Sequence, residues 1–396
     1  MKINTLLNPK FMFRRSDITD RVAGALYGGF EGHPTEDGFF NSIYKIEELG
    51  DKFILDSDSE ATSDHELDGM YEDLKPLGVD VSNSIILTNN VKMSKYDNMI
   101  TFPFILAQWI RIIQDRESYP YVPYTKEYIE KLKTYKKPYK FMCLNGEVRE
   151  QRLYLVQELH RKGYDKKGLV SLMDQGGYGL DTYRRNFNGR RYIPHQRSEN
   201  IPNDIFIEYP YEFDEEYFSK LPFLLDTIED KESNNWKAKT KYWPDGQLEA
   251  NRQIPKQFIE DCYLQFTSET TYWSSDGRYH HKMDCVSEKT YKSILFHPSL
   301  IFGSPGNLTL LKSYGFKTFS PLLDESYDEI KSDSDRFWAL FKEIDRLMAL
   351  SEDDLHDLFV ECLPIIEYNQ NQIFNMDYNS LIDKVRKEIQ EKMKNN

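Results

Sequence analysis

The chain has 396 residues and a formal net charge of −14, from 65 acidic and 51 basic side chains. Its apolar content of 39%, with 27 Tyr, 24 Phe and 5 Trp, excludes a disordered chain. No apolar run approaches the roughly 18 residues of a membrane span, and Met1–Asn8 is too poor in apolar residues for a secretory signal. Four scattered cysteines suit a reducing compartment. We therefore expect a cytoplasmic protein of two or three domains with no membrane partner.

The first third of the chain predicts few elements. Val79–Val81 and Ser84–Thr88 have the composition of short buried strands, and Asp56–Asp64 that of a solvated acidic loop. Lys126–Lys140 carries six Lys against two Glu, which predicts an exposed helix and a hinge. We therefore place a domain boundary near residue 135.

Beyond this boundary, strands and helices alternate along the chain. We expect strands at 139–144, 263–267, 298–302 and 316–319, and helices at about 148–162, 287–297, 307–314, 337–348 and 378–394. This alternation is typical of βαβ units and a parallel sheet.

In such sheets, ligands bind where helix N-termini follow the carboxyl ends of strands. Asn145 ends the first expected strand, and Arg149 and Arg152 are three residues apart on one face of the helix that follows. Two guanidinium groups there can clamp a diphosphate. The alternative is two surface arginines that pair with neighbouring glutamates.

Two further strand-to-helix junctions are candidates. In Ser287–Lys292, Glu288 can accept hydrogen bonds from ribose hydroxyls and Lys289 can bind phosphate, although an acid in a first turn is also ordinary helix-dipole chemistry. Gly303–Asn307 is a tight turn that either lets a ligand approach the backbone or is only a turn.

These motifs, taken in order, resemble the fucosyltransferase-like glycosyltransferases of bacteria and tailed phages. The resemblance covers about 139–350. It rests on short motifs at 144–152, 268–270, 287–292, 297–298, 302–306, 315–319 and 324–328. It implies an α/β fold of the GT-B type, with two Rossmann-type domains facing a cleft and C-terminal helices. The domains implied are an acceptor-side domain at 1–135, a nucleotide-sugar-binding domain at 136–350 and helices at 351–396 that pack back on the first domain.

The resemblance also implies the donor site and the reaction. Such enzymes are inverting, need no metal and use a nucleotide-diphosphate sugar as co-substrate. The residues implied for donor binding are Asn145, Arg149, Arg152, Glu269, Ser287, Glu288, Lys289 and Lys292. Relatives usually carry an Arg and a His where this chain has Gly146 and Gln151, so fucose is not implied as the sugar.

A carboxylate must deprotonate the acceptor hydroxyl. We expect it in the glycine-rich loop Gly28–Gly38, as Glu31, Glu36 or Asp37, while the alternative is a surface loop with ordinary acids. Asp56-Ser57-Asp58 matches the DxD motif of metal-dependent glycosyltransferases, but such a match arises easily by chance in a tract rich in Asp and Ser. His280 and His281 with Cys285 lack a CxxC-type partner for zinc, so we expect no metal site.

One segment departs from the acidic background. Residues 183–197 hold five Arg and no acid, interleaved with aromatic residues, which suits phosphate contacts and base stacking. Arg184, Arg185, Arg190 and Arg191 are therefore candidate acceptor-binding residues for DNA that carries hydroxymethylated bases, with Lys126–Lys140 on the same face. The host cytoplasm is the expected location if a phage encodes the chain. A glycan or other small acceptor, and a non-catalytic binding relative, are the alternatives.

Overall fold

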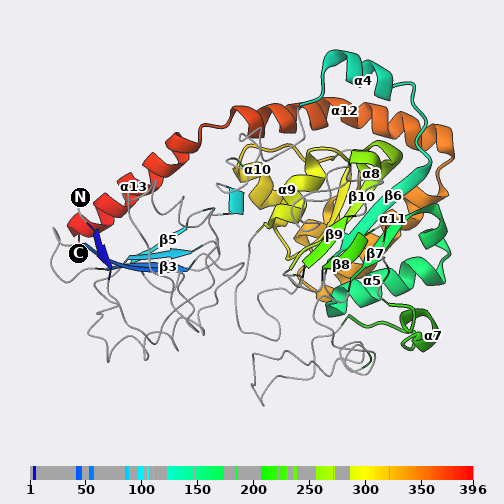
Figure 1. Ribbon diagram of the computed structural model, residues 1–396, viewed down its shortest axis with the longest axis horizontal. Coiled ribbons are helices and arrows are strands. Elements are labelled where there is room, and N and C mark those ends of the chain that lie inside the picture. Colours follow the sequence, from blue (N-terminus) through cyan, green and yellow to red (C-terminus); the bar gives the residue numbers. More distant parts are fainter. Residues whose placement is uncertain are drawn as a thin grey trace. The chain divides into compact units, whose positions relative to one another are not determined.

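The protein folds into two compact units, which the computed structural model describes in part (Figure 1). The described residues are 3–5, 42–46, 53–57, 85–88, 97–101, 103, 105–106, 110, 123–146, 148–173, 184, 207–221, 223, 225, 227–230, 235–238, 256–270, 272, 286–320 and 322–395. The first unit comprises Met1–Val122, Trp273–Glu288 and Gln372–Asn396, and the second comprises Pro123–Tyr272 and Lys289–Asn371.

The first boundary between the units lies before helix α4 (Lys126–Leu132), whereas the sequence places it near residue 135. Helix α4 belongs to the second unit, since its Ile129 and Leu132 are buried and the Tyr128 hydroxyl donates to Glu260 Oε1 at 3.2 Å. The second unit likewise includes residues 351–371, which the sequence assigns to a separate C-terminal segment.

A mixed sheet forms the centre of the described part of the first unit. Its strands, in spatial order, are β1 (Ile3–Thr5), β2 (Ser42–Ile46), β3 (Phe53–Ser57), β4 (Ile85–Thr88) and β5 (Met99–Thr101). Strands β1, β2 and β3 pair antiparallel, while β3, β4 and β5 pair parallel. Helix α13 (Tyr378–Asn395) packs on β4 and β5, and Lys392 Nζ donates to the carbonyl of Asp97.

A fully parallel sheet forms the centre of the second unit. Its spatial order is β11 (Ser299–Phe302), β10 (Cys262–Ser268), β6 (Tyr139–Asn145) and β7 (Gly168–Leu172). The α/β class is thereby confirmed, and the GT-B arrangement of two domains about a cleft stays a prediction.

Strand β7 was not predicted. It lies at the sheet edge and begins at Gly168, where a Cβ would lie 2.6 Å from the Phe141 ring, so no larger residue fits there.

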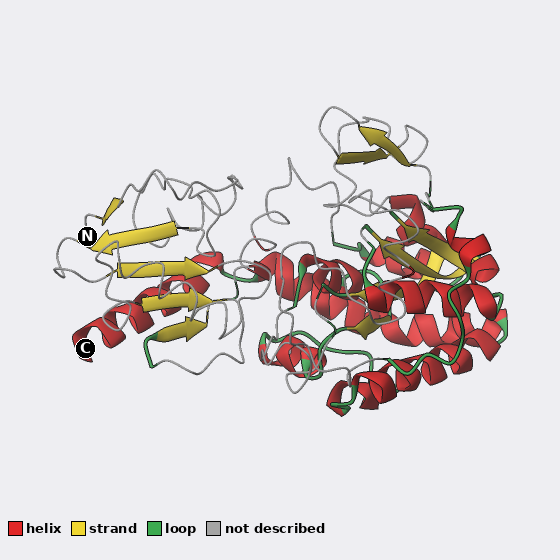
Figure 2. Ribbon diagram, turned by 90° about the horizontal axis from the view of Figure 1, so that it is seen from below, coloured by secondary structure: helices red, strands yellow, loops and turns green. Residues whose placement is uncertain are grey.

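Helices cover both faces of this parallel sheet (Figure 2). On one face, Phe302 of β11 contacts Phe337 of α11 (Asp333–Ala349), and Phe337 contacts Tyr154 of α5 (Glu150–Arg161). On the other face, Tyr263 of β10 contacts Phe359 of α12 (Glu352–Asn375). Asn369 of α12 donates to the carbonyl of Ile294, the last residue of α9 (Glu288–Ile294), and Gln370 to that of Leu295, so α9 lies with α12.

Phe316–Phe319 is not a strand, contrary to the prediction from its composition. Its backbone N–H groups donate to side chains and not to the carbonyls of a neighbouring strand. Lys317 N–H donates to Asn369 Oδ1 at 2.8 Å, and Phe319 N–H donates to Glu325 Oε1 at 2.6 Å. Burial raises the pKa of Glu325, although the hydrogen bonds that it accepts from Thr318 and Phe319 oppose the rise.

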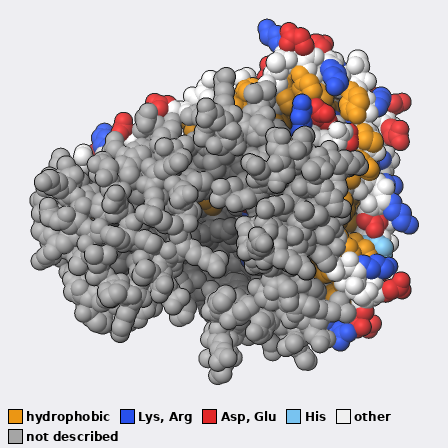
Figure 3. Space-filling model, viewed as in Figure 1, with side chains coloured by type: hydrophobic (Ala, Val, Ile, Leu, Met, Phe, Trp, Pro, Cys, Tyr) orange, Lys and Arg blue, Asp and Glu red, His pale blue; other side chains and the backbone are white. Residues whose placement is uncertain are grey.

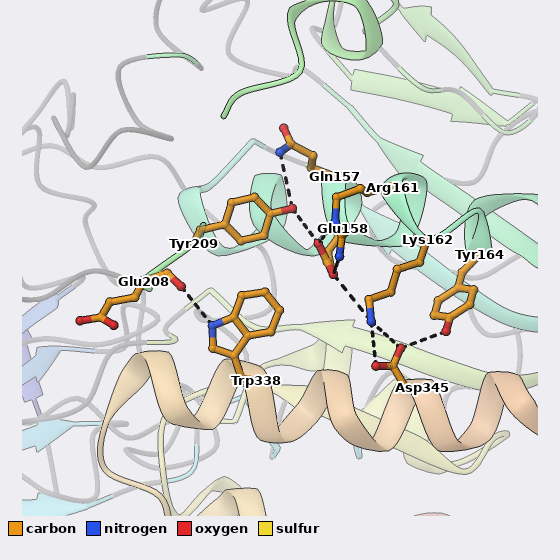
Figure 4. A network of polar contacts seen from close by, with 9 residues as sticks. All are labelled: Gln157, Glu158, Arg161, Lys162, Tyr164, Glu208, Tyr209, Trp338 and Asp345. Atoms are coloured by element: carbon orange, nitrogen blue, oxygen red, sulfur yellow. Dashed lines mark hydrogen bonds and ion pairs between the residues drawn. The ribbon is translucent and has the colours of Figure 1, made fainter. Parts of the chain in front are cut away.

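Residues 207–214 form a strap across α5 and α11 (Figure 4). The Tyr209 hydroxyl donates to Glu158 Oε2 at 2.9 Å, and Trp338 Nε1 donates to the carbonyl of Glu208 at 3.1 Å. The carboxylate of Glu158 has no exposed surface and is also paired with Arg161 at 2.7 Å. The strap thereby joins the two helices through a buried charge.

Shorter elements complete the described structure. They are α7 (Glu215–Phe218), α8 (Lys256–Asp261), α10 (Asn307–Ser313), the 3₁₀ turns Tyr164–Lys167 and Ser326–Glu329, and the hairpin β8 (Thr227–Asp230) and β9 (Asn235–Ala238). No helix among the described residues is long and apolar enough to cross a membrane.

Candidate functional site

The candidate site lies at the carboxyl edge of the parallel sheet, between β6 and β10. The chain continues from β6 outward to β7 and from β10 outward to β11, in opposite directions. The helices of these two crossovers, α5 and α9, lie on opposite faces of the sheet, which makes the β6–β10 junction a topological switch point. Ligands of open α/β sheets bind in the crevice at this point.

The first turn of α5 holds this edge together. Gln151 Nε2 donates to the carbonyl of Glu269 at 3.1 Å, and Arg152 Nη2 donates to the carbonyl of Ser268 at 3.2 Å. Arg152 is only 2% exposed. Gln151 and Arg152 therefore fix the start of α5 against the end of β10, a role that the sequence did not predict for either residue.

Arg149 differs from Arg152 in its placement. It is the N-cap residue of α5, with an extended backbone (φ −137°, ψ 155°), and its own side chain does not cap the helix. Its side chain is partly exposed. Asn145, at the end of β6, is buried and donates from Nδ2 to the carbonyl of Ser171 at 3.1 Å. Burial raises the pKa of the adjacent Cys143 thiol to about 12, so this thiol is not a nucleophile at neutral pH.

Glu269 connects the end of β10 to α9. Its carboxylate is buried and accepts a short hydrogen bond from the Thr290 hydroxyl. Lys289 Nζ donates to Thr270 Oγ1 at 3.3 Å. The motifs around 145–152, 268–270 and 289–292 therefore meet at one edge of the sheet. Thr290 belongs to this group, although the sequence did not single it out as a site residue.

The remaining residues implied for donor binding lie along α9. Lys292 lies within the helix, and 7% of its surface is exposed. Ser287 directly precedes the helix, and 1% of its surface is exposed. The division between the two units falls between Glu288 and Lys289. The assembly of Ser287 and Glu288 with the second unit into one donor site stays a prediction.

At the third strand-to-helix junction, Gly303–Asn307, a carboxylate of the protein itself caps the helix that follows. Asp328 accepts hydrogen bonds from the N–H groups of Leu308 and Thr309 at 3.0 and 3.1 Å, in the first turn of α10. Gly306 adopts a positive φ of 95° at the N-cap. A phosphate therefore has no free N–H groups at Leu308 and Thr309, directly after the Gly303–Asn307 turn.

Two lysines of the Lys126–Lys140 stretch serve the fold, and two more are paired with acidic residues on the surface. Lys137 Nζ donates to the last carbonyls of α8, and Lys140 Nζ donates to the carbonyls of Met348 and Leu350 at the end of α11. Lys133 pairs with Glu130, and Lys136 pairs with Asp353. On the face drawn in Figure 3, the described surface carries acidic and basic side chains side by side. The stretch therefore adds little to a basic surface.

Other predicted residues lie partly or wholly outside the described part of the chain. Arg184 is described, and its Nη2 pairs with Glu215 Oε1 at 2.5 Å, both side chains being exposed. Asp56 lies in β3. The predicted residues outside the described ranges are Glu31, Glu36, Asp37, Asp58, Arg185, Arg190, Arg191, His280, His281 and Cys285. Within the described ranges, no three His, Cys, Asp or Glu side chains are grouped to hold a metal ion.

Comparison with known proteins does not assign the chain to a family. No family model, no curated protein and no solved structure matches it.

Proposed function

We propose that the protein is a glycosyltransferase whose second unit binds a nucleotide-diphosphate sugar at the switch point between β6 and β10. One observation carries the proposal. Three motifs that lie far apart in the sequence, and that resemble the donor-binding motifs of fucosyltransferase-like enzymes, converge there through the contacts of Gln151, Arg152 and Thr290. A parallel sheet with this switch point is a common scaffold for nucleotide binding.

The cations at this edge suit the departing diphosphate. Arg149 at the start of α5 and Lys289 on α9 supply positive charge, and the N–H groups of the first turn of α5 add to it. As the bond between the anomeric carbon and the diphosphate oxygen breaks, these groups stabilise the negative charge that develops on the leaving group. The acceptor oxygen forms the new bond on the opposite face of the sugar, and a carboxylate takes its proton.

The acceptor is proposed to be a hydroxymethylated base in phage DNA, and Glu31, Glu36 or Asp37 to be the base. The arginine-rich segment 183–197 supports the DNA acceptor. The ion pair of Arg184 with Glu215 and the structural use of Lys137 and Lys140 favour the second candidate, a glycan or other small acceptor.

A thermal-shift screen of nucleoside diphosphates and nucleotide sugars tests the donor site. A donor at 100 times its dissociation constant should stabilise the protein by about 2.7 kcal/mol. Arg149→Ala and Lys289→Ala should each remove this shift and lower turnover by about 10²–10³, since each removes a donor to the leaving group. Lys256→Ala, on the exposed surface of α8, is the control. Unchanged binding and turnover in both variants would refute the site.

A further inference from the structure

The side chain of Asn307 is a buried amide whose hydrogen-bonding groups are unused. Asn307 is the first residue of α10 and is 1% exposed. Neither its Oδ1 nor its Nδ2 has a hydrogen-bond partner among the described residues. Buried amides are normally paired, because the loss of hydration is costly. An unpaired amide at the carboxyl edge of a sheet therefore points to a polar ligand.

Asn307 lies beside Glu269 of the candidate site. A Cβ atom built on Gly303 would lie 2.2 Å from Asn307 Nδ2 and 3.4 Å from Glu269 Cγ. Both side chains thus converge on the same point beyond the ends of β10 and β11, and only glycine at 303 leaves them room. Ser268, the last residue of β10, is 2% exposed, and its Oγ also has no partner among the described residues.

The charges around Asn307 restrict what it can bind. Glu269 approaches the same Gly303 position, and Asp328 accepts from the N–H groups of the next two residues, Leu308 and Thr309. Two acidic residues this near the amide disfavour an anion. In either flip state the amide presents an NH2 group that donates and an oxygen that accepts, which suits a neutral group that also does both. Hydroxyl groups do so, and a carboxylate such as that of Glu269 readily accepts from them.

We propose that Asn307 and Glu269 form a subsite for a pair of adjacent hydroxyl groups. This inference rests on the proposed function, because the hydroxyls belong to the donor, either to its ribose or to the transferred sugar. It assigns Asn307 as a ligand-binding residue and Gly303 as the residue that makes space for the Asn307 side chain.

The test compares the affinities of the wild type and Asn307→Ala for UDP, GDP, their 2′,3′-dideoxy forms, UDP-glucose and GDP-mannose. If the subsite binds ribose, the wild type should lose about three- to tenfold in affinity for each hydroxyl removed. Asn307→Ala should lose less, because only Glu269 remains to bind the hydroxyls. If it binds the sugar, Asn307→Ala should weaken the nucleotide sugars and leave UDP and GDP unchanged.

Two further variants guard against a folding defect. Gly303→Ala should give the same pattern, because the new methyl group displaces the amide. Ser313→Ala, at the exposed far end of α10, should bind as the wild type does. Equal affinities of the wild type and Asn307→Ala for every probe would overturn the proposal, and so would an equal loss for inorganic pyrophosphate, which has no carbon-bound hydroxyl.

A failure of the proposed function is recognised separately. In that case the wild type binds neither UDP, GDP nor a nucleotide sugar. Free ribose, glucose, galactose and mannose then decide the inference. Stabilisation of the wild type but not of Asn307→Ala by one of them supports the diol subsite, and no stabilisation by any of them overturns it.

Discussion

Arg336 Nη2 donates to the carboxylate of Asp333 at 2.7 Å, and each of the two side chains is only 1% exposed. The same guanidinium donates from Nε to the carbonyl of Gly303 at 3.1 Å and from Nη2 to the carbonyl of Tyr272 at 2.5 Å. Arg336 therefore fixes the segments that follow β10 and β11, and with them the edge of the sheet at which Glu269 and Asn307 lie.

Arg336→Met should lower the free energy of unfolding by about 3–5 kcal/mol, because it removes the guanidinium that neutralises the buried carboxylate of Asp333. Denaturant titration measures this loss. Lys136→Met removes the exposed pair with Asp353 and should change the stability little, because solvent screens such pairs. A loss in Arg336→Met no larger than that of the control would contradict the assigned role.

Asp328→Ala should destabilise the protein by about 1–2 kcal/mol, because the N–H groups of Leu308 and Thr309 lose their acceptor. Asp328→Asn keeps one acceptor oxygen and should cost less. Thermal unfolding of the two variants checks this order. Asp324→Ala is the control, because the exposed side chain of Asp324 accepts from the N–H of Ser326 and not from α10. If this control loses as much stability as Asp328→Ala, the loss does not come from a specific cap on α10.

The stability of the protein should depend on pH through Lys137. Burial lowers the pKa of this lysine from its ordinary 10.5 to about 8, although Cys262, Asp261 and Glu260 oppose the shift. Between these two pH values the unfolded chain binds a proton that the folded protein has released. The free energy of unfolding should therefore rise with pH over this range, by at most about 1.4 kcal/mol per pH unit from this group. Below pH 8 the lysine is protonated in both states, so the destabilisation from its burial is fully present and no longer changes with pH.

Lys137→Met should lack this rise, because methionine does not titrate. Denaturant titrations of the wild type and the variant at several pH values measure the difference, in which the contributions of shared Tyr and Cys residues cancel. Lys136→Met, at an exposed neighbouring position, should retain the wild-type profile. Parallel profiles for the wild type and Lys137→Met would show that Lys137 keeps its ordinary pKa.

The arginine-rich segment separates the two acceptor classes. If it follows a DNA backbone, Arg190→Gln with Arg191→Gln should weaken binding of hydroxymethylated duplex DNA at low salt. The log–log salt slope should shrink by roughly 0.9 per lost phosphate contact. Arg184→Gln should change it less, since Arg184 pairs with Glu215. An unchanged DNA affinity with a raised Michaelis constant for the nucleotide sugar would place the segment at the donor site instead.

The sequence by itself determined many, but not all, of the local elements of the second unit. Strands β6, β10 and β11 and helices α5, α9, α10 and α11 lie close to their expected ranges, and Gly163 follows the end of α5 with a φ of 68°. These features depend on the spacing of apolar residues and on caps, which neighbouring residues supply.

Only the tertiary structure decided how these elements are used. The strand order, the pairing of β7 and the absence of a strand at Phe316–Phe319 depend on partners far away in the chain, such as Phe141 and Asn369. The same holds for the polar side chains. Spacing alone does not show that Arg152 binds backbone carbonyls, that Asp328 closes the start of α10, or that the amide of Asn307 is left without a partner among the described residues. Burial and hydrogen bonding are properties of three-dimensional neighbours, and a single sequence lists only the neighbours along the chain.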